Sequence, residues 1–174
     1  NFFFDFSKQR INRQILDNLI LLSKERKAKE LFKDMVTGKT INITENRAVL
    51  HTATRDFSNS KDYYENPEII PQIKTVNKKI KSFTENLHQG IIKSGSNKPF
   101  TDAVIVGIGG SYLGCEFAYT ALKHSIAPRI NLHFLPNVDI DNFGQVIKSL
   151  DPETCLWIVI SKSYTTTETM ANLS

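Results

Sequence analysis

Apolar residues recur every three or four positions through residues 1–98, and this spacing indicates amphipathic helices. Four helices are expected there. The first follows a Ser7 N-cap, the second covers residues 28–35, the third covers residues 45–54, and the longest begins near Pro67. The longest helix carries one apolar stripe: Ile69, Ile73, Val76, Ile80, Phe83, Leu87 and Ile91. Because such a stripe usually packs into a core, we expect an all-helical N-terminal region over residues 1–98.

Beyond the turn-rich segment 94–99, the pattern changes to short apolar runs separated by helical segments. Buried strands are expected at residues 103–106, 130–135 and 156–160, each followed by a helix. Strands that are apolar throughout are typical of a parallel sheet covered by helices on both faces. The sequence therefore predicts an α/β fold, an α/β/α sandwich around a parallel sheet. Since three strands leave an uncovered edge, residues 99–174 are expected to be only part of this domain.

The composition is that of a globular chain with a sizeable core. Hydrophobic residues make up 40% and charged residues 23% of the 174 positions. No apolar run approaches the roughly 20 residues that a membrane helix needs. Cys115 and Cys155 are too few for a disulfide framework and are expected to be buried thiols in a reducing compartment, which favours the cytoplasm. The four histidines are scattered without metal-binding spacing, so a metal site is not predicted.

The net charge of +4 suits an anionic ligand, either a nucleic acid or a small phosphate ester. The basic residues are spread along amphipathic helices and do not gather in one stripe. Lys78, Lys79 and Lys81, for example, belong to the polar face of the longest helix. Binding of nucleic acid is therefore not predicted.

A glycine-rich loop, Gly107–Gly114, follows the first strand and precedes a helix. Glycines let the backbone approach a ligand, and the start of a helix offers unpaired N–H groups to an anion. A dinucleotide fingerprint, G-x-G-x-x-G, is one alternative, but Tyr112 occupies its third glycine position. Residues 135–137 also lack the carboxylate that would bind a ribose after the second strand. From this loop alone, anion binding and a plain strand-to-helix turn are equal alternatives.

A hydroxyl-rich loop follows the third strand and runs from Ser161 to Glu168, with hydroxyl groups at positions 161, 163, 165, 166 and 167. Hydroxyls and backbone N–H groups can satisfy the acceptor oxygens of a phosphate monoester. The alternative is a capping box, in which Thr165 and Glu168 seal the helix end. A capping box leaves Ser161, Ser163 and Thr166 unexplained, so phosphate binding is favoured.

The two loops follow strands of one parallel sheet. In such a sheet, the loops that follow the strands gather at the end of the sheet where the strands have their C-termini. We call this end the carboxyl edge, and it is where ligands bind. We therefore expect the glycine-rich and hydroxyl-rich loops to open at the same edge and to hold a single anion between them.

These loops resemble, in the same order, the two phosphosugar loops of the glucose-6-phosphate isomerase family. Further collinear matches extend the resemblance along the chain, at residues 5–8, 41–51, 137–139 and 150–154. The resemblance implies two sugar-isomerase (SIS) domains of flavodoxin-like type. This chain would then be an N-terminal fragment, with the helical region at 1–98 and the first half of the first SIS domain at 99–174.

Carried over residue by residue, the resemblance assigns the substrate phosphate to the hydroxyl-rich loop: Ser161, Lys162, Ser163, Tyr164, Thr165 and Thr166. Gly110 and Ser111 would border the sugar. The implied reaction exchanges glucose 6-phosphate and fructose 6-phosphate, in glycolysis and gluconeogenesis, by ring opening and proton transfer through an enediol. The family's base carboxylate, histidine and lysine would lie beyond Ser174, so no catalytic residue is assigned here. The resemblance also implies no cofactor, no metal, and a homodimer for the whole enzyme.

Two other functions compete with an isomerase segment. One is a non-catalytic SIS module that binds a sugar phosphate for regulation, and the other is a nucleotide-binding oxidoreductase. The helical N-terminal region, with its match at residues 41–51, favours the isomerase over the module. The missing third glycine and the missing ribose carboxylate disfavour the oxidoreductase.

Overall fold

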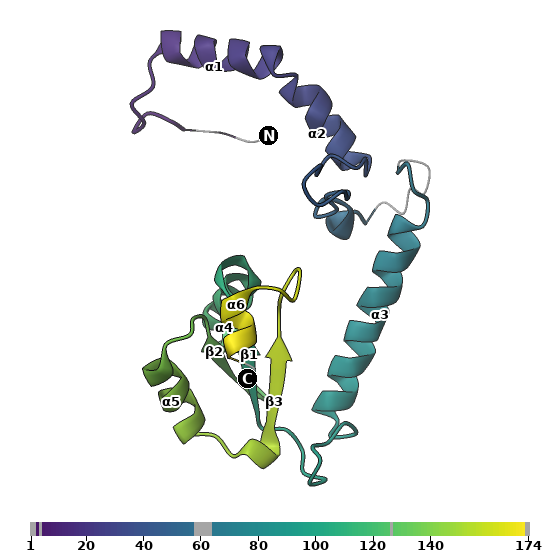
Figure 1. Ribbon diagram of the computed structural model, residues 1–174, viewed down its shortest axis with the longest axis vertical. Helices are drawn as coiled ribbons and strands as arrows, with labels where there is room; N and C mark the ends of the chain where they lie inside the picture. The colour runs from purple at the N-terminus through teal and green to yellow at the C-terminus, as the bar shows by residue number, and fades with distance from the viewer. Residues whose placement is uncertain (1–2, 4, 58–63, 126, 173–174) are drawn as a thin grey trace. The chain divides into compact units, whose positions relative to one another are not determined.

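The computed structural model describes residues 3, 5–57, 64–125 and 127–172 (Figure 1). The chain divides into two compact units, Asn1–Lys78 and Lys79–Ser174. The boundary falls inside the long helix α3, Ile69–His88. The domain limit expected between residues 98 and 99 stays a prediction.

The first unit contains α1 (Arg13–Glu25) and α2 (Ala28–Val36). The N-cap of α1 is Asn12, whose side-chain oxygen accepts a hydrogen bond from the Ile15 N–H at 2.9 Å. The predicted Ser7 N-cap is wrong. The Ser7 N–H instead donates to the Asp5 carboxylate at 2.8 Å, and this local turn keeps the chain out of the helix.

The helix predicted at residues 45–54 is also wrong. A tight loop stands there, in which the backbones of Asn42 and Arg47 exchange hydrogen bonds of 3.2 Å in both directions. The Asn42 side-chain oxygen accepts bonds from the Thr44 hydroxyl at 2.8 Å and from the Glu45 N–H at 3.3 Å. Such side chain to backbone bonds compete with helix formation, and only a short 3-10 turn, η1 (Ala53–Arg55), follows.

The core of the first unit is small and lies where α3 begins. Its buried members are Ala53, Tyr64, Ile69 and Ile70, and Leu50 and Ile73 pack against them. The Tyr64 hydroxyl donates to the Asp56 carboxylate at 2.9 Å, so its polar end is satisfied at the rim of this core.

The prediction that the whole α3 stripe is a core seam is wrong beyond its first turns. Ile69 is buried, whereas Val76, Ile80 and Phe83 keep 53%, 58% and 46% of their surface exposed. Within the second unit, Ile80 and Phe83 line one side of an apolar groove whose other wall includes Leu156 of the sheet. The helix itself is confirmed, but apolar spacing alone does not show what covers the apolar face of a helix.

The second unit is an α/β structure with a three-stranded parallel sheet in the order β2-β1-β3. The strands are β1 (Asp102–Val106), β2 (Asn131–Leu135) and β3 (Cys155–Val159). Each lies within one residue of its predicted limits, because an unbroken apolar run marks a buried strand clearly. The central strand β1 is buried from its second residue to its last.

Helices cover both faces of this sheet, which confirms the predicted layers (Figure 1). They are α4 (Leu113–Leu122), α5 (Ile140–Lys148) and the short α6 (Thr167–Ala171). On one face, side chains of α5 pack on the main core cluster: Val104, Val106, Leu135, Cys155, Phe143, Val146, Leu150 and Val159. On the opposite face, the Tyr119 ring of α4 lies 6.0 Å from the Phe134 ring of β2.

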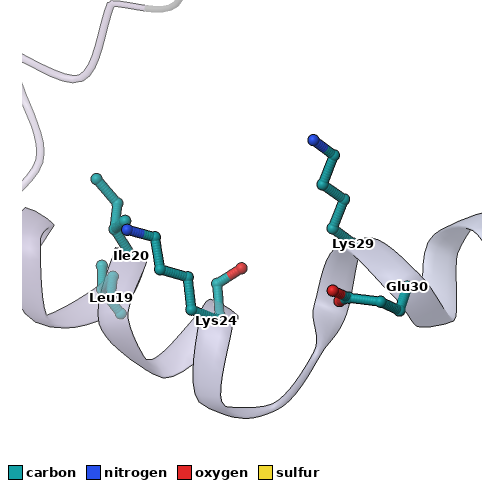
Figure 2. Close-up of a pocket in the computed structure, with 6 residues that line it drawn as sticks. Leu19, Ile20, Lys24, Lys29 and Glu30 are labelled. Carbon is teal, nitrogen blue, oxygen red and sulfur yellow. The ribbon is translucent and has the colours of Figure 1, made fainter.

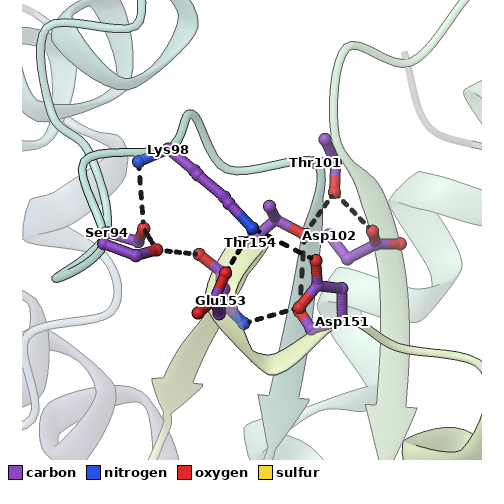
Figure 3. A network of polar contacts seen from close by, with 8 residues as sticks. Ser94, Lys98, Thr101, Asp102, Asp151, Glu153 and Thr154 are labelled. Carbon is purple, nitrogen blue, oxygen red and sulfur yellow. Dashed lines mark hydrogen bonds and ion pairs between the residues drawn. The ribbon is translucent and has the colours of Figure 1, made fainter.

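A polar network holds the amino edge of the sheet together (Figure 3). The Thr101 hydroxyl lies 2.7 Å from the Asp102 carboxylate and 3.0 Å from the Thr154 hydroxyl. The Lys98 ammonium is paired with Glu153. Asp102 also contacts His133 Nε2 at 2.9 Å, so this histidine has a polar partner within the fold. These bonds join the three strands where they begin, at the edge opposite the two candidate loops.

Candidate phosphate-binding site

The two candidate loops begin side by side at the carboxyl edge of the sheet. Val106, the last residue of β1, is in register with Val159, the last residue of β3. One residue further, the Ile160 N–H donates to the Val106 carbonyl at 2.9 Å. The expectation that both loops open at the same edge is therefore confirmed.

Gly107 lies in the tightest contact between the loops. A Cβ atom at this position would stand 3.2 Å from the carbonyl oxygen of Ile160 and 3.1 Å from Cβ of Ser111. Both distances are shorter than most contacts of real Cβ atoms, so a side chain at position 107 would force a neighbouring atom to shift. The first glycine of the loop thus has a packing reason that involves no ligand.

The rest of the glycine-rich loop is open. Gly109 has a φ of 54°, which favours glycine, and it begins a 3-10 turn, η3 (Gly109–Ser111). Gly110 is exposed, and a Cβ atom there would meet nothing within 4 Å. Ser111 is half-buried, and Tyr112 at the N-cap of α4 makes no side-chain capping bond. The packing of the described chain therefore gives no reason for the absence of a side chain at Gly110.

The hydroxyl-rich loop is organised by its own serines. Ser161 Oγ accepts a hydrogen bond from the Tyr164 N–H at 3.0 Å. Ser163 Oγ accepts one from the Thr165 N–H at 3.4 Å and one from the Thr165 hydroxyl at 2.8 Å. Tyr164 has a φ of 55° and an exposed ring. These bonds fold residues 161–165 into a compact turn in which Ser161 is half-buried and the other four residues are exposed.

The capping box expected as the alternative role of this loop is not formed. The N-cap of α6 is Thr166 rather than Thr165, and its side chain makes no capping bond. The Thr165 hydroxyl instead donates a hydrogen bond to Ser163 Oγ. The hydroxyl cluster is therefore not explained by helix capping.

The structure brings together the predicted site residues of each loop at one edge, but their contact with a phosphate stays a prediction. Ser161 and Thr166 are half-buried, and Lys162 is exposed with its positive charge at the same turn. Nothing in the described residues contradicts the assignment of Gly110 and Ser111 to the neighbouring loop.

Another surface pocket has no comparable chemistry. It lies between α1 and α2 and is lined by Leu19, Ile20, Ser23, Lys24, Lys29 and Glu30. Figure 2 shows that the ammonium groups of Lys24 and Lys29 do not converge on a common point. Among the described residues, no group of three or more His, Cys, Asp or Glu side chains could hold a metal ion, and no helix is long and apolar enough to span a membrane.

Comparison with known proteins decides the family. The model of the phosphoglucose isomerase family matches residues 5–174. The chain belongs to the phosphoglucose isomerase family. Glucose-6-phosphate isomerase of Desulfosudis oleivorans is 50% identical over 169 residues, which are 97% of this chain and 31% of that protein. The enzyme of Legionella pneumophila strain Lens is 41% identical over 97% of this chain and 34% of its own length.

Solved structures agree with this membership and with the fold. A crystal structure of a glucose-6-phosphate isomerase from Chlamydia trachomatis matches with a TM-score of 0.72 and 31% identity. The match covers 94% of this chain and 31% of that one. The chain thus spans about a third of the length of its phosphoglucose isomerase relatives, and the resemblance drawn from its loops is confirmed.

Proposed function

We propose that this chain supplies the phosphate-binding part of a glucose-6-phosphate isomerase, which interconverts glucose 6-phosphate and fructose 6-phosphate. Family membership supports the reaction. The observation that carries the binding role is the side-by-side origin of the two loops, fixed by the Ile160 to Val106 hydrogen bond and the contact at Gly107. The regulatory alternative has no observation of its own in its favour.

The serine hydroxyls are suited to bind a group that only accepts hydrogen bonds. A hydroxyl has one proton to donate and two lone pairs to accept with. Ser163 Oγ accepts two bonds from Thr165, so its remaining capacity is to donate its proton. Ser161 Oγ accepts one bond, and its proton is likewise available. A phosphate monoester presents such acceptor oxygens, and the Lys162 charge opposes that of the phosphate.

The reaction needs no further reactant. After ring opening, a proton moves from one of the adjacent carbons C1 and C2 to the other through an enediol, and a hydroxyl proton moves in the same direction between the oxygens on these carbons, so atoms and electrons balance within the sugar. In this proposal, the hydroxyl-rich loop holds the phosphate, and Gly110 and Ser111 border the carbon chain. Holding the phosphate fixes the position of C6 in the site and so limits where the reacting carbons can lie, which is the positioning role of a binding site remote from the chemistry. The base, histidine and lysine implied by the resemblance come from outside this chain.

The test is the double variant Ser161→Ala with Thr166→Ala, made in the complete enzyme that carries this sequence. Losing two donors of ~1 kcal/mol or more each should raise KM for fructose 6-phosphate at least about tenfold. KM is measured in an assay coupled to oxidation of the glucose 6-phosphate formed. The matched control is Thr84→Ala with Ser149→Ala, because these hydroxyls bond to nearby carbonyls of their own helices. Equal KM values in the two double variants would remove the hydroxyl-rich loop from the site.

We further propose a cytoplasmic location and a homodimer for the complete enzyme. Two cysteines without a disulfide, one exposed and one buried, support a reducing compartment. The dimer rests on family resemblance. Light scattering of the purified enzyme measures its mass directly, and a monomeric mass would contradict the dimer.

A further inference from the structure

The hydroxyl-rich loop is held by the fold at both of its ends. The hydroxyl-rich loop is held at its start by β3, which is bonded to β1 in the sheet. At its other end the loop enters α6, which has five residues, Thr167–Ala171. Contacts between α6 and the rest of the unit therefore fix this second end of the loop.

Two residues of this segment supply such contacts. Thr169 is 2% exposed and is thus packed into the fold. Asn172, at the C-cap of α6, donates from Nδ2 to the carbonyl oxygen of Asn137 at 2.8 Å. Asn137 lies 35 residues earlier, in the loop that follows β2.

The acceptor is itself firmly placed. The Asn137 side chain accepts a bond from the Asp139 N–H at 3.1 Å. Asp139 then caps α5, accepting from the N–H groups of Asp141 at 2.8 Å and Asn142 at 3.1 Å. Since α5 packs on the main core cluster, the Asn137 carbonyl is tied to a helix that is packed on the sheet.

We infer that Asn172 is a positioning residue, whose amide joins the hydroxyl-rich loop to the loop after β2 and so holds the phosphate donors in place. The inference rests on the proposed function for its effect on substrate, but the bond itself does not depend on it. Without the bond, the loop has to be ordered when phosphate binds, and this ordering weakens affinity. Because the phosphate is held in the ground state and the transition state alike, KM should rise while kcat changes little.

The kinetic test compares Asn172→Asp with Asn172→Ala in the complete enzyme. Aspartate has the shape of asparagine, but its carboxylate cannot donate and faces a carbonyl oxygen. We expect KM for fructose 6-phosphate, and the inhibition constant of inorganic phosphate, to rise about tenfold for Asp and about fivefold for Ala. Gln145→Glu makes the same change from amide to carboxylate at an exposed position of α5 and should leave both constants unchanged. If Asp behaves like the unchanged enzyme and Ala is the worse variant, the residue acts by packing and the inference is wrong.

Hydrogen exchange measured by mass spectrometry tests the bond without using the reaction. In Asn172→Asp, amides of residues 164–172 should exchange faster, while those of β3 keep their protection. Unchanged exchange there would overturn the inference even if the enzyme is active. Faster exchange in an enzyme without isomerase activity would support the bond and contradict only the proposed function.

Discussion

The two edges of the parallel sheet are both polar, yet they satisfy their polar groups in different ways. At the amino edge (Figure 3), Thr101 and Lys98 contact partners 53 and 55 residues away, Thr154 and Glu153. At the carboxyl edge, the serine oxygens of the hydroxyl-rich loop accept bonds from residues two or three positions away. Groups of the first kind bond to one another and hold the strands together. The serine hydroxyls at the carboxyl edge are oriented by bonds within their own loop. Their protons can still be donated to a ligand.

This difference separates stability from binding within one small unit. Changes at the amino edge should alter the free energy of unfolding and leave KM alone. Changes at the exposed positions of the carboxyl edge should do the reverse. Gly107 is the exception, because it lies at the carboxyl edge but is packed from both sides.

Gly107→Ala should have the largest effect on stability. The new methyl would press on the Ile160 carbonyl and on Ser111, so we expect a loss of about 1–3 kcal/mol together with a higher KM. Urea denaturation measures the first and the coupled assay the second. Gly144→Ala is the matched control, because this glycine lies in α5 with nothing within 4 Å of an added Cβ, and alanine favours a helix. Equal urea midpoints for the two variants would show that the loops are not packed as described.

Thr101→Val should have the second largest effect on the free energy of unfolding. Valine has no hydroxyl for Asp102 and Thr154, so we expect a loss of about 0.5–1 kcal/mol in the free energy of unfolding. KM should stay unchanged, since this side chain lies at the edge away from the loops. A rise in KM comparable to that of the Ser161/Thr166 double variant would contradict the conclusion that the amino edge contributes to stability and not to binding.

Asp102 should make stability depend on pH. Burial raises the pKa of this carboxyl group, but hydrogen bonds from His133, Thr101 and Asn131 outweigh burial and lower the pKa below its usual value. The ionised carboxylate therefore stabilises the fold above its unfolded-state pKa of about 4, and this stability is lost as the pH falls through the lower, folded-state pKa. Urea midpoints between pH 3 and 7 should fall less steeply with acid for Asp102→Asn. Parallel curves for the two proteins would show that the carboxylate contributes nothing.

Gly110→Ala should have the smallest effect on stability, within about 0.5 kcal/mol, because a Cβ at this exposed position meets nothing within 4 Å. If the glycine is there to let the sugar approach, the methyl should still weaken binding severalfold. A normal KM would remove Gly110 from the substrate site and leave Ser111 as the residue of the glycine-rich loop assigned to it.

The sequence predicts the sheet well and the polar contacts poorly, for physical reasons. Unbroken apolar runs such as 103–106 can only be buried strands in this context, and parallel strands bring their following loops to one edge. The helix expected at 45–54 does not form, because the Asn42 side chain accepts hydrogen bonds from the Thr44 hydroxyl and the Glu45 N–H. The periodicity of apolar residues gives no information about such bonds. The bond between Asn172 and Asn137 joins positions 35 residues apart, so spacing along the chain contains no sign of it.

The two cysteines of the chain differ in a way that chemistry can use. Cys155 is buried in the main cluster, and burial, followed by the nearby Asp102 charge, raises the pKa of its thiol. Cys115 is exposed near the start of α4, directly after the glycine-rich loop, so the expectation that both thiols are buried is wrong for this residue. A thiol-reactive dye should therefore label this segment of the unmodified chain at Cys115, and its fluorescence would report on the nearby glycine-rich loop without any substitution.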